Sequence, residues 1–165
     1  MKNTCLLFAV MLCHLAAEAQ LKTTAACPAF TIDILRGRIN ETLTIKSTVG
    51  ELKAAFPCFT SAEDEAASSK CGGGVFFKDK DIYFYTGRDY VEIGEKFKGK
   101  LSVPLMGAPR NGMFKWLGNP LLKDATFDVY QTAYGILILY FNKANKVNKI
   151  QASLEGVNTI KLCEN

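Results

Sequence analysis

The chain has 165 residues, a formal net charge of +4, 48% hydrophobic residues and 22% charged residues. This balance is typical of a globular protein and excludes a largely disordered chain. A mild positive charge gives no indication of nucleic-acid binding. The only histidine, His14, lies in the segment that we expect to be removed on export. The mature chain therefore cannot contain a histidine-based catalytic triad or a histidine-ligated metal site.

The first 19 residues have the pattern of a cleavable signal peptide. Lys2 precedes an apolar run over residues 6–15, and the small-x-small triplet at 17–19 places Gln20 first in the mature chain. The alternative is a buried N-terminal helix. The run is too short to cross a bilayer, and no later stretch reaches the length of about 20 apolar residues that a membrane span needs. We therefore expect a secreted or periplasmic protein that does not insert into a membrane after signal cleavage.

Four cysteines remain in the mature chain: Cys27, Cys58, Cys71 and Cys163. An even number in an exported chain indicates disulfides, with three possible pairings. We favour Cys58–Cys71, which closes a short loop, together with Cys27–Cys163, which ties the two chain ends. A zinc site is the alternative, but the paired C-x-x-C spacing of zinc ligands is missing. We expect neither a metal nor a cofactor.

In chain order, alternating apolar residues predict a strand over 30–34, and Asn40 begins an Asn-x-Thr glycosylation sequon. Thr48 is a candidate cap for a helix that carries Val49, Leu52 and Phe56 and stops at Pro57. A second short helix should cover residues 113–117, with Trp116 in the core, and stop at Gly118.

Residues 20–165 are expected to form a single domain with a weak internal repeat. The tripeptides at 43–45 and 101–103 are similar, and each precedes a helical pattern and then a three-strand meander. The repeats cover about 43–98 and 101–155. The first meander has strands at 74–77, 81–85 and 90–93, and the second has strands at 127–134, 135–141 and 147–153. This order predicts an α+β fold, an antiparallel sheet with short helices packed on one face.

The helix ending near Leu117-Gly118-x-Pro120, the tyrosine-rich strands and the last strand beginning Lys146-Val147 resemble two related families. One is the β-lactamase-inhibitor-protein-like fold, whose members carry two such units in tandem. The other is the small outer-membrane assembly lipoprotein family (BamE, or SmpA/OmlA), which has one unit. The resemblance covers about residues 43–153. It implies that the sheet offers a concave face to a protein partner.

Tyrosines are the candidate partner-binding residues. Alternate strand residues share a face, so Tyr83 and Tyr85 should point together, as should Tyr130 and Tyr134. If the helices cover the purely apolar side, these four side chains line the open face of the sheet, where tyrosine offers rigid contact area and a hydroxyl. The alternative is that they pack at the sheet rim with their hydroxyls in water.

We therefore expect a monomeric, non-catalytic domain that binds another protein, of inhibitor or immunity type, and binds no nucleic acid. One alternative is a structural or assembly module of the cell envelope. Another is a secreted hydrolase that uses paired carboxylates. The candidate pairs for such an enzyme are Glu92 with Glu95 and Asp124 with Asp128, although solvated surface positions are the simpler interpretation of all four.

Overall fold

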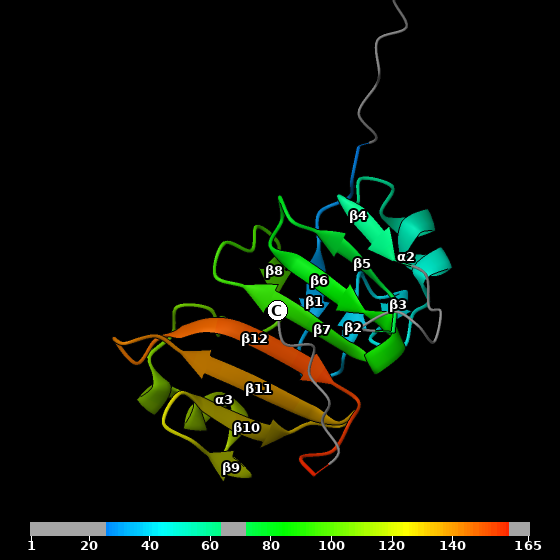
Figure 1. Cartoon of the computed structure of the whole chain (residues 1–165). Helices are drawn as coiled ribbons and strands as arrows, with labels where there is room; N and C mark the ends of the chain where they lie inside the picture. The colour runs from blue at the N-terminus through cyan, green and yellow to red at the C-terminus, as the bar shows by residue number, and fades with distance from the viewer. Residues whose placement is uncertain (1–25, 64–71, 159–165) are drawn as a thin grey trace, which may run out of the picture.

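A computed structural model describes residues 26–63 and 72–158 (Figure 1). The predicted signal peptide, Cys71 and Cys163 lie outside the described residues. The first part of the chain contains β1 (Thr31–Asp33), β2 (Arg38–Ile39), β3 (Leu43–Thr44), α2 (Val49–Ala55), β4 (Ser61–Glu63), β5 (Gly74–Phe77), β6 (Ile82–Tyr85), a 3₁₀ turn (Thr86–Arg88) and β7 (Tyr90–Gly94). The second part contains β8 (Lys100–Leu101), a 3₁₀ turn (Arg110–Gly112), α3 (Phe114–Leu117), β9 (Leu122–Lys123), β10 (Phe127–Gln131), β11 (Ile136–Phe141) and β12 (Val147–Ser153).

Eight strands form one antiparallel sheet, which we call the large sheet, in the order β4-β5-β6-β7-β12-β11-β10-β9. Each half is a four-strand meander, and the halves meet where β7 pairs with β12, with Ile93 opposite Ile150. The predicted meanders had three strands each. The missing strands, β4 and β9, have only three and two residues, which is too short for an alternating pattern to stand out in the sequence.

A second, small sheet has the order β3-β2-β1-β8. Its strand β1 confirms the predicted first strand and pairs in parallel with β8, where Ile32 lies opposite Leu101. The small sheet packs behind one half of the large sheet (Figure 1). Its Ile32 and Ile39 belong to the largest cluster of buried apolar side chains, which we call the main core. The protein is therefore α+β as predicted, but a strand layer as well as the short helices covers the sheet. Pairing between residues 69 apart in the chain leaves no local sequence signal.

Helix α2 follows the prediction. The Thr48 hydroxyl accepts a hydrogen bond from the Glu51 backbone N–H, and the Glu51 side chain accepts one from the Thr48 N–H, which completes a capping box. Leu52 and Phe56 are buried on the side that faces the sheet. The helix ends at Ala55, with Phe56 as its C-cap, because Pro57 follows.

Helix α3 has a single turn and ends at Gly118, whose φ is +71°. Met113 and Leu117, four residues apart, contact the main core. Trp116, which we expected in the core, is 41% exposed. That prediction is wrong because successive helix residues are about 100° apart, so a one-turn helix that buries Met113 and Leu117 turns Trp116 away.

The structure joins Cys27 to Cys58, with the Cα atoms 5.4 Å apart. The predicted pairs Cys58–Cys71 and Cys27–Cys163 are therefore wrong. Phe30 lies three residues after Cys27, and Phe56 lies two residues before Cys58. The rings of these two phenylalanines stack with their centroids 4.2 Å apart. This contact in the main core brings the two cysteines together, and chain spacing alone could not reveal it.

Candidate functional site

One face of the large sheet packs against the small sheet, and we call the other one the second face. The register of the strands shows which side chains lie on the second face. Across its middle, the paired residues run Phe76, Tyr83, Glu92, Gln151, Ile138 and Val129. The neighbouring row contains Tyr85, Tyr90, Ser153 and Ile136. The second face is thus aromatic at one end, polar in the centre and aliphatic at the other end.

Tyr83 and Tyr85 share this face, as their alternation predicted. The Tyr85 ring stacks on Tyr90, with centroids 4.4 Å apart, and lies 5.3 Å from Phe76. Tyr85 is only 4% exposed, whereas Tyr83 is partly exposed and its hydroxyl donates to Asp81 Oδ1 over 3.3 Å. Of the two, Tyr83 is the one that a partner could reach in the described structure.

Tyr130 and Tyr134 do not lie on the second face, so that part of the prediction is wrong. Tyr130 is 2% exposed in the main core, and its hydroxyl donates to Asp128 Oδ2 over 3.3 Å. Burial raises the pKa of Tyr130 to about 12. Tyr134 follows the end of β10 and donates to the Ile34 carbonyl over 2.8 Å. Strand β10 turns Val129, and not the tyrosine, toward the second face, because the core side supplies Asp128 with a cationic partner.

That partner is Arg110. Its guanidinium donates to both carboxylate oxygens of Asp128 at 2.6 and 3.1 Å, donates to the Asp124 carbonyl at 2.6 Å, and lies 4.7 Å from the Phe141 ring centroid. The Asp124 carboxylate accepts from the Thr126 N–H. Asp124 and Asp128, one of the candidate acid pairs, are therefore engaged in holding the β9–β10 turn.

A polar chain, which sequence reasoning missed, crosses the centre of the second face. Gln151 donates to Glu92 Oε2 and accepts from the Tyr140 hydroxyl, both over 2.7 Å. Lys149 lies 3.6 Å from the same Glu92 oxygen and 4.3 Å from the Tyr140 ring centroid. Burial raises the pKa of Tyr140 to about 12. The alternation of Lys149 and Gln151 along β12 was the available sequence signal.

Beside this chain lies an open hollow of about 520 Å³, lined by Asp81, Tyr83, Glu92, Glu95, Tyr140 and Lys149 among others. Glu92 and Glu95, the other candidate acid pair, both reach it. The Asp81 carboxylate accepts the Lys96 N–H over 2.8 Å, which fixes the strand end beside it. Of the two acids, Glu92 is already bound by Gln151 and Lys149.

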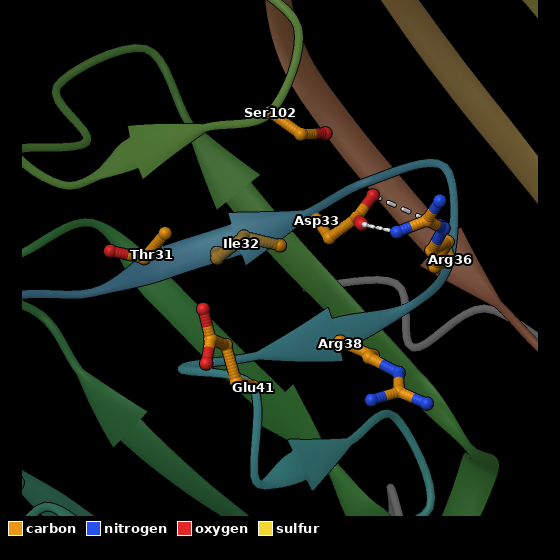
Figure 2. A pocket seen from close by; sticks show the side chains of 7 residues that line it. All are labelled: Thr31, Ile32, Asp33, Arg36, Arg38, Glu41 and Ser102. Atoms are coloured by element: carbon orange, nitrogen blue, oxygen red, sulfur yellow. Dashed lines mark hydrogen bonds and ion pairs between the residues drawn. The ribbon is translucent and has the colours of Figure 1, made fainter.

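Figure 2 shows a second hollow, of about 540 Å³, over the small sheet. Asp33 faces Arg36 across 3.8 Å, and Arg38 and Glu41 extend in different directions from β2 and the turn after it. The Ser102 hydroxyl accepts the Ile34 N–H over 3.1 Å, so it serves the fold. Arg36, Arg38 and Glu41 are exposed, Asp33 is half-buried, and these side chains do not converge on one point.

Four large apolar side chains of residues 114–122 are exposed, and we call this group the α3–β9 patch: Phe114 at 66% exposure, Trp116 at 41%, Leu121 at 56% and Leu122 at 43%. Leu122 belongs to β9, the edge strand of the large sheet, and α3 lies at the same end of the molecule (Figure 1). Leu35, at 37%, is the other exposed large apolar residue within the described ranges. The patch was missed because Trp116 was assigned to the core.

Within residues 26–63 and 72–158, no group of three or more potential ligands could hold a metal ion, and no helix is long and apolar enough to cross a membrane. Comparisons with family models, curated proteins and solved structures found no match to the chain.

Proposed function

We propose that the protein is an exported, non-catalytic domain of inhibitor or immunity type that binds another protein through the α3–β9 patch. The observation that carries the proposal is the exposure of four large apolar side chains within nine residues. Large exposed apolar patches mark interaction sites in folded proteins. Aromatic residues such as Phe114 and Trp116 supply much of the binding energy where they become buried.

The surroundings of the patch indicate the chemistry of the partner. Lys115 lies 4.8 Å from the Trp116 ring centroid, and Lys123 follows Leu122 in β9. A neighbouring hollow of about 430 Å³ is lined by Arg110 and Lys123 among others. An apolar centre with a basic rim favours a partner that presents apolar side chains flanked by carboxylates.

The edge position of β9 adds a second mode of contact. The Leu121 N–H donates to the Val129 carbonyl over 2.7 Å, and alternation along the strand directs the backbone groups of Leu122 outward. An extended segment of the partner could therefore add to the sheet edge while its side chains contact Phe114 and Leu121.

The tandem repeat is part of the same proposal. A short strand and a short helix precede each half of the large sheet: β3 and α2 before the first, β8 and α3 before the second. The halves meet antiparallel at β7 and β12, which is the arrangement that duplication of one unit would produce. This order supports the relationship to the tandem inhibitor-like fold. The Cys27–Cys58 disulfide supports the proposed secreted or periplasmic location.

The experiment is capture of partners from the extracellular and envelope fractions of the source cells by immobilised protein. We compare wild type with a Phe114→Ser/Leu121→Ser variant, and Leu35→Ser is the control because Leu35, at 37% exposure, is an exposed large apolar residue outside the patch. We expect wild type and the control to retain one partner that the double variant captures about tenfold less well.

Equal capture by all three proteins would refute the patch as the binding surface. Turnover of a substrate by the purified protein would refute the non-catalytic assignment. Retention of an envelope-assembly complex would instead favour the structural-module alternative.

A further inference from the structure

The hollow of about 430 Å³ next to the α3–β9 patch, which we call the third hollow, differs from the other two in the charges that line it. Asp33 and Glu41 line the hollow over the small sheet, and three acidic residues line the one on the second face. The lining of the third hollow contains the cations Arg110 and Lys123 and no acidic residue. An anionic group that enters it therefore meets no opposing carboxylate in the wall.

The walls of the third hollow come from three separate segments: residues 109–111, Lys123 and residues 144–145. The Arg110 N–H donates to the Asn145 carbonyl over 2.9 Å, and Pro109 pairs with Lys146 in an antiparallel bridge. The Arg110 guanidinium also donates to the Asp124 carbonyl over 2.6 Å, which ties the first segment to the residue after Lys123. The fold thus holds the walls in place, so that a ligand does not have to order them.

Hydrogen-bond donors remain free in the third hollow once the fold has formed. The side chains of Asn111, Lys123 and Asn145 are exposed and have no hydrogen-bond or ion-pair partner among the described residues. An ammonium group has three N–H donors, and a primary amide has two. An ionised carboxylate only accepts hydrogen bonds, and those from a charged donor are the stronger ones. This set of donors therefore fits a carboxylate.

The charge of the surrounding chain favours the same ligand. Residues 101–158 contain six Lys or Arg and three Asp or Glu, whereas the described residues before 101 contain ten and nine. Two of the six cations, Lys143 and Lys146, are exposed on either side of the wall formed by residues 144–145. The part of the chain that carries the α3–β9 patch is thus the more basic part, which attracts an acidic partner.

We propose that the third hollow is a carboxylate subsite of the α3–β9 patch, in which Asn111, Lys123 and Asn145 bind an aspartate or glutamate side chain of the partner. This inference rests on the function proposed above. Leu121 and Lys123 are alternate residues at the sheet edge, and alternation places their side chains on one side, roughly 7 Å apart. Alternate residues of an extended partner segment have the same spacing. The segment therefore contains an apolar residue, which contacts Leu121, and an acidic residue two positions away, which enters the third hollow.

The test uses the full mature protein and two synthetic peptides. One peptide, acetyl-Thr-Leu-Thr-Glu-Thr-Leu-Thr amide, has the required spacing in both chain directions, and the other has glutamine in place of glutamate. Trp116, the only tryptophan and a member of the patch, reports binding through its emission. We expect wild type to bind the glutamate peptide about fivefold more tightly than the glutamine peptide at low salt. This preference should disappear at about 1 M salt, where exposed charges are screened.

Three variants locate the preference. Lys123→Gln should abolish it, and Asn145→Gly, which keeps the left-handed backbone at φ +54°, should reduce it. Lys46→Gln is the matched control, because Lys46 is an exposed lysine outside the lining of the third hollow, and it should keep the full preference. Equal binding of the two peptides by wild type, no binding of the glutamate peptide, or an undiminished preference in Lys123→Gln would overturn the subsite.

The function proposed above fails on a different result. If Phe114→Ser/Leu121→Ser binds both peptides as tightly as wild type does, the α3–β9 patch is not the binding surface, and the subsite is overturned with it. If this double variant loses both peptides while wild type binds them equally, the patch stands and the carboxylate subsite alone is rejected.

Discussion

The Arg110 guanidinium donates two hydrogen bonds, of 2.6 and 3.1 Å, to the Asp128 carboxylate, and the Asp128 side chain is only 1% exposed. The same guanidinium donates to the carbonyls of Asp124 and Ala125. One side chain thus ties the segment before α3 to the β9–β10 turn. Because both segments border the α3–β9 patch, this ion pair holds the proposed binding surface in place.

Removing the arginine should therefore destabilise the protein strongly. Arg110→Ala leaves a buried carboxylate unpaired, and we expect the free energy of unfolding in urea to fall by about 3 kcal/mol. Arg110→Lys should recover only part of this loss, because a single ammonium group cannot reproduce the paired geometry. A loss below about 0.5 kcal/mol, the size typical of an exposed ion pair, would contradict the role assigned to Asp128.

Asn40 should matter for the connection between β1 and β2. Its side-chain oxygen accepts the Thr31 N–H over 2.7 Å, its amide donates to the Ala29 carbonyl over 3.0 Å, and its φ is +46°. We expect Asn40→Ala to lower the unfolding free energy by about 2 kcal/mol, through lost hydrogen bonds and left-handed backbone strain. Asn40→Gly removes the strain and should cost less. Equal losses for the two variants in urea unfolding would contradict the contribution of the backbone.

The raised tyrosine pKa values predict a loss of stability at high pH. Folding raises the pKa of Tyr140 from about 10 to about 12, so the folded state binds this proton more tightly than the unfolded state does. The resulting stabilisation is complete below pH 10 and is lost as the pH rises from about 10 to 12. Tyr140→Phe should flatten this decline in urea unfolding free energies. An unchanged pH profile in the variant would show that Tyr140 titrates normally.

Trp116 provides a direct spectroscopic check, because it is the only tryptophan. At 41% exposure, its indole should emit at the long wavelengths typical of a hydrated tryptophan and should be quenched readily by acrylamide. Addition of the partner should shift the emission to shorter wavelength and protect it from quenching. Short-wavelength, poorly quenched emission from the free protein would restore the original prediction that Trp116 lies in the core.

Local patterns predicted the elements whose causes are local. Thr48, the predicted cap, begins α2, and alternation placed Tyr83 and Tyr85 on one face. The failures have non-local causes. Tyr130 faces the core because Arg110, twenty residues earlier, supplies a partner for Asp128, and Cys27 pairs with Cys58 because Phe30 stacks on Phe56.

The candidate binding surface shifted for the same reason. The helical pattern at 113–117 predicted that Trp116 is buried. The observed helix has one turn, and the burial of Met113 and Leu117 sets its orientation. Neither the length of α3 nor the edge position of β9 could be read from residue types alone. Both determine that the exposed apolar side chains gather at residues 114–122.

The central claim, that the α3–β9 patch binds a protein partner, is tested most directly by amide hydrogen exchange of the protein alone and in complex with its captured partner. We predict slower exchange in the complex over residues 113–123, with β6, β7 and β12 unchanged. Slower exchange in β6 and β7 with no change over 113–123 would contradict the account and return the binding site to the second face.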